Sequence, residues 1–342
     1  MIERFGISAG ASGNRRVLLL GATGTIGRAT VRALLGRGHE VVCFIRPRGG
    51  RVAAGPNSDL EALAGAEVRL GVLTDPVSWQ RDALRGEHFD AIVSCLASRT
   101  GAPCDAQAID LGAHRLALAA AQQAGIAHFV LLSAICVQKP LLAFQRAKLA
   151  FEAELRASAL SWSIVRPTAY FKSLAGQVER VRRGRPFLVF GDGSLTACKP
   201  ISDRDVAEYL AGCLEDPARH NRVLPIGGPG DAITPRQQGE HLFALLGRPP
   251  PFRQVPVAML DFIVGALSLL ARVVPSLADK AEFARIGRYY ATESMLVLDP
   301  TTGKYEAAAT PSTGSDLLFD YYAQLLERTA YAERGEHAVF KD

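Results

Sequence analysis

The sequence lacks the features that define several large classes of protein. Its longest uncharged apolar run, Phe262–Ala271, is much shorter than the ~20 residues that a membrane-spanning helix needs. The six cysteines are scattered without a CxxC pair, which argues against a disulfide framework and against a metal site. Basic residues number 39 and acidic residues 34, and this small excess does not indicate the dense cationic surface of a nucleic-acid-binding protein.

The amino-terminal segment also lacks the apolar core of a secretory signal, and we expect residues 1–15 to form a flexible tail of a cytoplasmic protein. The composition is that of a globular protein, since 48% of the 342 residues are hydrophobic and 21% are charged. A chain of this length is typical of about two domains. The net charge of +5 suits an anionic small molecule or an anionic membrane surface as a partner.

Short apolar runs alternate with helical patterns through the first half of the chain. This alternation predicts an α/β fold, a Rossmann-type doubly wound parallel sheet with helices on both faces. We assign residues 16–170 to a nucleotide-binding Rossmann domain that residues 203–228 rejoin, and residues 171–342 to a smaller, mostly helical substrate-binding region. The expected strands are 17–20, 40–45, 67–72, 91–95, 128–133 and 162–165, with helices at 25–37, 106–124 and 144–157.

A different pattern follows Arg166-Pro167. We expect a short strand at Phe187–Phe190 that enters a hairpin at Gly191-Asp192-Gly193. Ser202 is expected to cap a helix that ends near Leu214. The other expected elements are a strand at 223–226 and helices at 234–246, 260–274 and 315–328.

A glycine-rich segment directly follows the first expected strand and opens the first expected helix. Gly21 permits a tight turn, Gly24 lets backbone amides approach a pyrophosphate at the helix N-terminus, and Gly27 allows close packing of helix and strand. This GxxGxxG pattern between a strand and a helix predicts a dinucleotide site. Its expected binding residues are Gly21, Thr23, Gly24, Thr25, Ile26 and Gly27.

The residues that follow the second strand select the cofactor. NAD enzymes place an acidic residue there, whereas this chain has Arg46 and Arg48, which together with Arg28 suit a 2′-phosphate. We therefore expect NADPH as the cofactor, with solvated loop arginines as the alternative explanation. Asp75, which ends the third strand, is expected either to contact the adenine or to cap the next turn.

Lys148 lies four residues after Phe144 on one face of an expected helix. With the glycine motif and the strand order, this pair makes the chain resemble the short-chain dehydrogenase/reductase superfamily, which usually has Tyr-x-x-x-Lys here. The resemblance implies that Lys148 hydrogen-bonds the nicotinamide ribose. Phe144 cannot give a proton to an alkoxide as the family tyrosine does. Either the protein only binds NADPH, or its reaction forms no alkoxide.

Hydride addition to a conjugated carbon–carbon double bond forms no alkoxide, because a large π-system spreads the negative charge. The proton can then come from water or a weak acid, and Tyr170 is the nearest phenol and our candidate catalytic donor. We expect Arg166 to form a structural ion pair. Residues 94–98 and 133–134 follow two strands and are expected either to line the nicotinamide or to serve packing alone.

Longer blocks make the chain resemble one family of this superfamily, the NADPH-dependent 3,8-divinyl (proto)chlorophyllide a 8-vinyl reductases, whose members also have Phe at the position of Phe144. The resemblance runs from about residue 17 to about residue 333. It implies reduction of a vinyl group of divinyl chlorophyllide or protochlorophyllide to ethyl in (bacterio)chlorophyll synthesis. Plastid members carry long transit extensions, and no such extension is expected in this chain. The resemblance therefore implies a protein of a phototrophic bacterium. The matching blocks are 21–27, 144–152, 166–173, 190–193, 198–202, 224–230, 286–290 and 293–296.

A divinyl pigment is flat and apolar and carries a propionate, so it needs a broad apolar pocket and at least one cation. Residues 257–277 offer apolar side chains, and we expect Leu260–Ala271 to form a buried core helix, a pocket wall or a face for peripheral membrane contact. His220 and His241 are considered as axial ligands of the pigment's magnesium, with ordinary polar roles as the alternative. The candidate partners of the propionate are Lys172, Lys199, Arg285 and Arg288.

Two other functions stay open on the sequence. The missing tyrosine also fits a catalytically silent NADPH-binding regulator or assembly factor. The same fold would also serve an enoyl-type reductase of small phenolic substrates.

Overall fold

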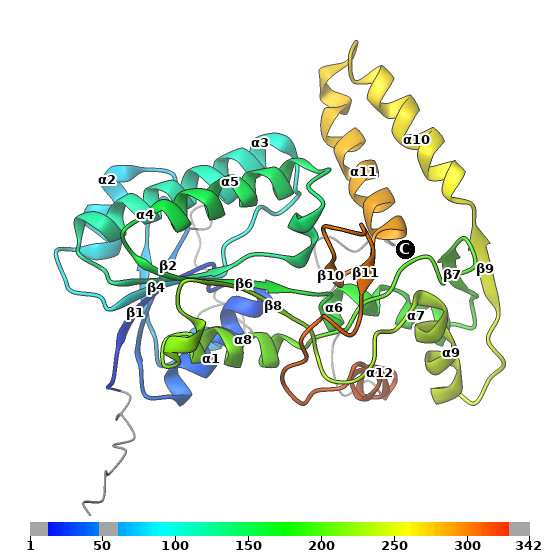
Figure 1. The fold of residues 1–342 in the computed structure, drawn as a ribbon, viewed down its shortest axis with the longest axis horizontal. Coiled ribbons are helices and arrows are strands. Elements are labelled where there is room, and N and C mark those ends of the chain that lie inside the picture. The colour runs from blue at the N-terminus through cyan, green and yellow to red at the C-terminus, as the bar shows by residue number, and fades with distance from the viewer. Residues whose placement is uncertain (1–12, 48–60, 328–342) are drawn as a thin grey trace, which may run out of the picture.

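A computed structural model of the protein describes residues 13–47 and 61–327. A sheet of seven parallel strands forms its centre, in the order β3-β2-β1-β4-β5-β6-β8 (Figure 1). This arrangement confirms the predicted Rossmann-type doubly wound sheet. The strands are β1 (Arg16–Leu20), β2 (Glu40–Ile45), β3 (Glu67–Leu70), β4 (Ala91–Ser94), β5 (His128–Leu132), β6 (Ser161–Pro167) and β8 (Arg222–Ile226).

Helices cover both faces of this sheet. Figure 1 shows α4 and α5 on one face and α1 and α8, which pack against each other, on the opposite face. The central strands β4 and β5 are covered on both faces and buried throughout, which explains their nearly continuous apolar sequences, whereas the edge strands β3 and β8 are only partly buried. These helices are α1 (Thr25–Gly36), α2 (Pro76–Ser78), α3 (Pro103–Asp105), α4 (His114–Gln123), α5 (Ala143–Ala157) and α8 (Asp203–Gly212). A π-helical segment, Ala106–Ala113, connects α3 to α4.

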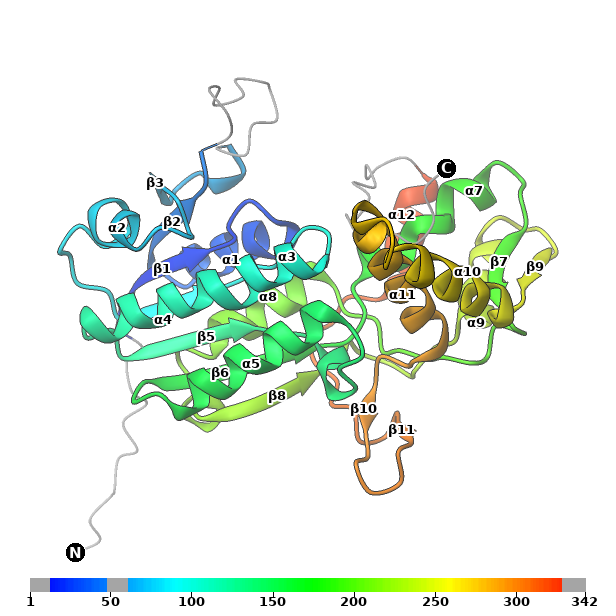
Figure 2. The same cartoon turned by 90° about the horizontal axis from the view of Figure 1, so that it is seen from above.

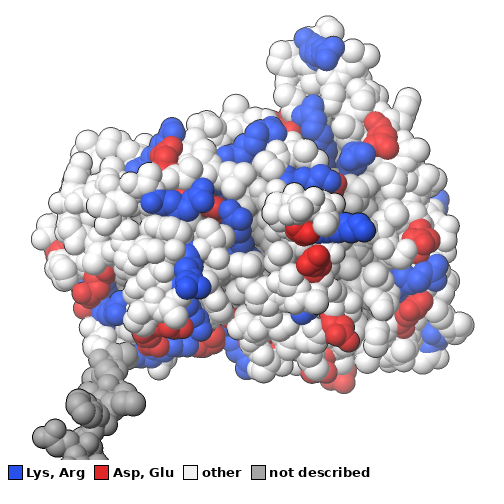
Figure 3. Space-filling model, in the orientation of Figure 1, with Lys and Arg blue, Asp and Glu red and all other residues white. Residues whose placement is uncertain are grey.

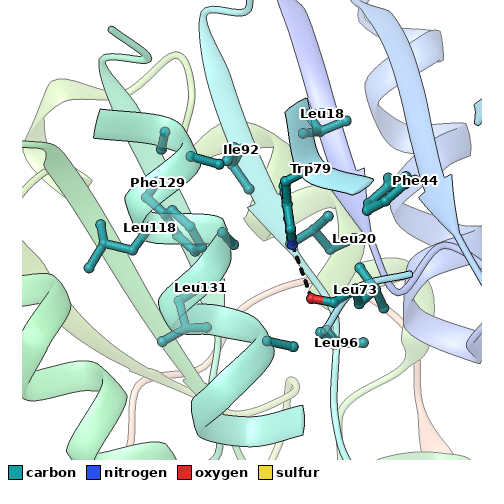
Figure 4. Packing of buried hydrophobic residues seen from close by; sticks show 14 of the residues in the cluster. Leu18, Leu20, Phe44, Leu73, Trp79, Ile92, Leu96, Leu118, Phe129 and Leu131 are labelled. Carbon is teal, nitrogen blue, oxygen red and sulfur yellow. Dashed lines mark hydrogen bonds between the residues drawn. The ribbon is translucent and has the colours of Figure 1, made fainter. Parts of the chain in front are cut away.

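The core beneath α4 fixes the chain where β2 and β3 end (Figure 4). The buried Trp79 ring packs edge-on against Phe44, with 5.2 Å between ring centroids, and its Nε1 donates a hydrogen bond to the Leu73 carbonyl at 3.0 Å. The Gly71 amide donates to the Ile45 carbonyl at 3.0 Å. These contacts hold the segment that follows β3 against the end of β2.

The carboxyl-terminal part forms a mainly helical region beside the sheet (Figure 2). It has its own apolar core, in which Phe171, Val181, Phe243 and Tyr322 are fully or almost fully buried. Its helices are α6 (Phe171–Leu174), α7 (Val178–Arg182), α9 (Pro235–Leu245), α10 (Val257–Leu270), α11 (Ala278–Thr292) and α12 (Leu318–Leu326). Its strands are β7 (Phe187–Phe190), β9 (Phe252–Val255), β10 (Val297–Leu298) and β11 (Tyr305–Glu306).

Two expectations for this region are wrong. β7 enters no hairpin, because Gly191 and Gly193, with φ of 59° and 84°, turn the chain away and β7 pairs in parallel with the distant β9. The helix expected at Leu260–Val274 begins earlier, as α10, and contains no buried residue, so it is not a core helix.

Candidate cofactor and substrate site

The glycine motif forms a loop that only glycine can build at two of its positions. Gly21 ends β1 with φ of 74°, and a Cβ there would lie 2.6 Å from the Cys95 carbonyl group. A Cβ on Gly27 would lie 2.1 Å from the Gly21 carbonyl oxygen. The Gly24 amide closes the turn by donating to that same oxygen at 3.1 Å. The motif therefore brings the start of α1 close to the ends of β1 and β4.

The N-terminus of α1 fits a phosphate group. The strand order reverses between β1 and β4, and ligands of such sheets bind outside the strand ends at that point. Gly24 provides no side-chain cap, and the first turn of α1 holds no acidic residue. The free amides and the positive end of the helix dipole are thus available to an anion. Thr25 in this turn accepts a hydrogen bond from Lys172 Nζ at 2.7 Å.

Of the residues expected to read the adenosine half, the structure describes Arg46, Arg28 and Asp75. Arg46 directly follows β2 and is exposed, whereas Arg48 lies outside the described residues. Arg28 Nε donates to the Thr23 carbonyl at 3.0 Å and so belongs to the glycine loop. Asp75 caps α2, because its Oδ1 accepts from the Val77 amide at 3.0 Å. Of the two roles considered for Asp75, capping is the one that the structure displays.

Lys148 is held in a buried polar cluster behind the loop that follows β4. Its Nζ lies 3.0 Å from Oδ1 of Asp110, and the side chain of Asp110 is fully buried while that of Lys148 is 10% exposed. The Ser98 amide reaches the same Oδ1 at 3.4 Å, and Oδ2 has no hydrogen-bond partner. The neighbouring His114 bonds Ser94 Oγ at 2.8 Å. Burial and the charge of Lys148 lower the pKa of His114 to about 4.

Arg166 forms the structural ion pair that its position suggested. Its Nε donates to Glu152 at 3.1 Å, and a second guanidinium nitrogen donates to the other carboxylate oxygen. Ser133 Oγ donates to the same carboxylate at 2.5 Å, and Glu152 is fully buried. This network ties α5 to the ends of β5 and β6, so Ser133 has a packing role in the described structure.

An apolar cavity of about 300 Å³ lies beyond the ends of β5 and β6. Tyr170 and Cys136 line it from the sheet side, and Tyr290 of α11 lines it from the helical region. Burial, with smaller contributions from neighbouring cysteines, raises the pKa of both phenols above the ordinary value, so both carry their proton at neutral pH. Neither Phe144 nor Lys148 borders this cavity.

Tyr290 is a cavity-lining residue that the sequence did not identify as a functional side chain. It belonged to the block 286–290 that carried the family resemblance, but no helix was expected there. Its neighbour Tyr289 donates from its hydroxyl to the Cys136 carbonyl at 2.8 Å, which anchors α11 against the sheet side of the cavity.

The four cations considered for the pigment propionate do not border the cavity. Lys172 reaches Thr25, as noted, and Lys199 Nζ donates to the Thr310 carbonyl at 3.0 Å. Arg285 bonds Ser268 at 2.8 Å, and Arg288 pairs with Asp261, so both join α11 to α10.

The two histidines considered for magnesium are likewise occupied elsewhere. His220 Nε2 contacts the Cys213 carbonyl at 3.1 Å, and the His241 ring stacks on Phe319. Neither lines the cavity. Residues 13–47 and 61–327 contain no group of three side chains suited to hold a metal ion.

The α10–α11 hairpin projects from the helical region (Figure 1), and exposed apolar side chains lie along its outer face. Phe262 and Val273 are 75% and 81% exposed, and Met259, Ile263, Leu269 and Leu270 are also exposed. Figure 3 shows this projection as mainly uncharged surface with a basic side chain at its end. No helix in the described part of the chain combines the length and apolarity needed to cross a membrane.

Comparison with known proteins agrees with a nucleotide site at these strand ends. Residues 21–217 match a family model described as NAD(P)H-binding. The solved binary complex of leucoanthocyanidin reductase with NADPH from Vitis vinifera has a TM-score of 0.66 and 17% sequence identity, covering 91% of this chain and 99% of that one. At this identity the likeness shows the fold alone.

Two plant proteins are much closer in sequence. A protein of Oryza sativa subsp. indica named "Divinyl chlorophyllide a 8-vinyl-reductase, chloroplastic" is 52% identical over 331 residues, which cover 95% of this chain and 82% of that protein. The protein of the same name from Arabidopsis thaliana is 49% identical over 329 residues, covering 94% and 79%. These identities extend through the cavity-lining helical region as well as the sheet.

Proposed function

This chain belongs to the family of divinyl chlorophyllide a 8-vinyl-reductases, and from that premise we propose how its residues divide the work of the reaction. The protein reduces the 8-vinyl group of divinyl chlorophyllide to ethyl, with NADPH as its cofactor. The observation that carries this conclusion is the 52% identity over 331 residues, which cover 95% of this chain.

NADPH, when bound, supplies the hydride. The loop from Gly21 to Gly27 would hold its pyrophosphate at the N-terminus of α1, where two glycines leave room for the backbone to approach. Arg46 and Arg48 would pair with the 2′-phosphate. Lys148, paired with Asp110 at 3.0 Å, would orient the nicotinamide ribose through its hydroxyl groups.

Phe144 is compatible with this reaction because no alkoxide forms. One hydride and one proton add across the vinyl double bond, and the conjugated macrocycle carries the transient negative charge. Tyr170, a protonated phenol on the cavity wall, is the proposed proton donor, and Tyr290 offers a second phenol on the opposite wall. Residues 16–170, joined by 203–228, would bind the nucleotide, and residues 171–342 would supply most of the pigment-binding surface.

The outer face of α10 is the proposed point of peripheral membrane contact. The inner face of α10 packs on α11. The exposed apolar side chains therefore serve no packing role within the described structure. Arg272 follows this face at the end of the hairpin, where it suits an anionic lipid headgroup. A lipid surface is also where an apolar pigment accumulates, and α11 connects that end of the hairpin to the cavity through Gly287 and Tyr290.

A spectroscopic assay tests the proposed function. Purified protein with NADPH and divinyl chlorophyllide should shift the Soret band to the blue, because one vinyl group leaves conjugation. Intact NADPH binding without a shift would favour the silent regulator. Turnover of small enones with no action on the pigment would favour the enoyl-type reductase of phenolic substrates.

A further inference from the structure

We propose that Lys172 binds the pyrophosphate of NADPH and so completes the cofactor site from the substrate side of the molecule. The assignment rests on the proposed use of NADPH by this fold. It differs from the sequence expectation, in which Lys172 was a candidate partner of the pigment propionate.

The geometry places the ammonium group at the start of α1. Lys172 lies in α6, far along the chain from the glycine motif, yet its Nζ donates to Thr25 Oγ1 at 2.7 Å. Thr25 is the first residue of α1, the helix whose N-terminal amides face the dinucleotide position. A phosphate oxygen that accepts from these amides would therefore lie within reach of the same ammonium group.

The charges at this point call for an anion. The N-terminus of α1 carries about half a positive charge from its dipole, and Lys172 adds a full one. The first turn of α1 contains no acid to offset them. Asp203 is one acid near Lys172, and it also faces Arg32. Burial, the largest cause, raises the pKa of Asp203 above its ordinary value, while Lys172 and Arg32 act to lower it. A phosphate group bound at this helix end would face both the helix dipole and the Lys172 ammonium group.

The position of Lys172 is built into the fold rather than left to a loose loop. Phe171 beside it is buried and its amide donates to the Ile201 carbonyl at 3.2 Å. Two residues later, the Leu174 carbonyl accepts from the Tyr322 hydroxyl at 2.9 Å. These anchors hold α6 on both sides of Lys172, so the side chain is presented to the glycine loop in a fixed direction.

The propionate of the pigment is a less suitable partner for Lys172 than the pyrophosphate, because Lys172 does not line the cavity. Its neighbours Ser173 and Leu174 do. One short helix therefore faces the cofactor with its lysine and the pigment with the residues that follow.

Binding measurements on Lys172→Met test the assignment. Calorimetric titration with NADPH, 2′-phospho-ADP-ribose and 2′-AMP separates the pyrophosphate from the 2′-phosphate, since 2′-AMP has no pyrophosphate. We expect Lys172→Met to weaken the first two ligands about 10- to 100-fold, the loss typical of one charge-assisted hydrogen bond. Binding of 2′-AMP should not change, and Lys172→Arg should keep most of the affinity for NADPH. Lys304→Met removes the same charge from an exposed position between β10 and β11 and is the matched control.

Three results would overturn the assignment. Unchanged NADPH affinity in Lys172→Met would show that the ammonium does not touch the cofactor. An equal loss of 2′-AMP would indicate a general structural defect, which thermal melting would also reveal. A higher KM for divinyl chlorophyllide at saturating NADPH, with cofactor affinity intact, would return Lys172 to the propionate. Because these titrations need no pigment turnover, failure of the proposed reaction would leave their result unaffected.

Discussion

Lys148 and Phe144 share one face of α5 but have different surroundings. This difference is consistent with a site that has no tyrosine at position 144. Lys148 is paired with the buried Asp110 and retains the means to hold a ribose. Phe144 packs between apolar clusters, near Gly101, and does not border the cavity. The phenols that do border it, Tyr170 and Tyr290, come from other elements.

Lys148→Ala should lower kcat about 100-fold, because the nicotinamide would lose its orientation. The substitution also leaves Asp110 buried without a partner, so the double variant Lys148→Ala/Asp110→Ala is the control for folding. The double variant should be equally slow in the Soret assay. A rate near that of the wild type in either protein would refute the role given to Lys148.

Arg46→Ala combined with Arg48→Ala should weaken NADPH far more than NADH. A charge-assisted contact to the 2′-phosphate is worth roughly 1.5–3 kcal/mol, so the loss should be about tenfold or more for NADPH alone. Fluorescence titration with both cofactors measures it. Equal losses for NADPH and NADH would mean that these arginines do not read the phosphate.

Helices and strands whose apolar residues recur with one regular spacing could be predicted from the sequence. Elements whose position depends on contacts with distant segments could not. The strands of the sheet and Ser202 at the start of α8 follow from local sequence, and Ser202 accepts from the Asp205 amide as an N-cap should. α11 was missed because its charged residues interrupt the apolar pattern, although two of them, Arg285 and Arg288, bond α10. The pairing of β7 with β9 joins segments far apart in the chain, which no local pattern reports.

The same limit applies to the site. The glycine loop was predictable because the spacing of its glycines between a strand and a helix is a local sequence pattern. The pairing of Lys172 with Thr25 and of Lys148 with Asp110 depends on the tertiary arrangement, so sequence could name the residues but not their partners.

Phe262→Ser with Val273→Ser should release the protein from lipid vesicles. Each apolar side chain buried in an interface contributes about 1.5–3 kcal/mol, so the pair should weaken binding by about 100-fold or more. Co-sedimentation with vesicles of phosphatidylcholine and phosphatidylglycerol measures it, and Val77→Ser, at an exposed site on the opposite part of the molecule, is the control. Unchanged sedimentation of the variant with vesicles would contradict membrane contact through α10. If the wild type forms a dimer that the variant does not form, this face would instead bind a second copy of the chain.

Considered as a whole, the molecule places a rigid sheet beside a helical region and forms its cavity where the two meet. In the proposed function, cofactor and pigment would meet at one edge of the sheet, the edge at which all seven parallel strands end. Two histidines, His114 and His128, are buried in this assembly. Burial lowers the pKa of His114 to about 4 and that of His128 to about 3.

Stability should therefore fall as the pH is lowered from about 6.5 to about 4. In that range the unfolded chain gains a proton on His114 that the folded chain does not, so protonation favours unfolding, by on the order of 3 kcal/mol for this group. Urea unfolding of His114→Gln across the same range should show a shallower decline than the wild type. His88→Gln, which changes an exposed histidine, should decline as the wild type does. Identical slopes for His114→Gln and the wild type would exclude this group as the cause.

The central claim is that the vinyl group receives its hydride directly from NADPH while the conjugated pigment carries the charge. A single turnover with NADPH deuterated at both C4 positions, followed by mass spectrometry of the pigment, tests it. The account predicts one deuterium in the new ethyl group from the cofactor and, in a separate reaction in heavy water with ordinary NADPH, one from solvent. An ethyl group with no deuterium from the cofactor would contradict the account.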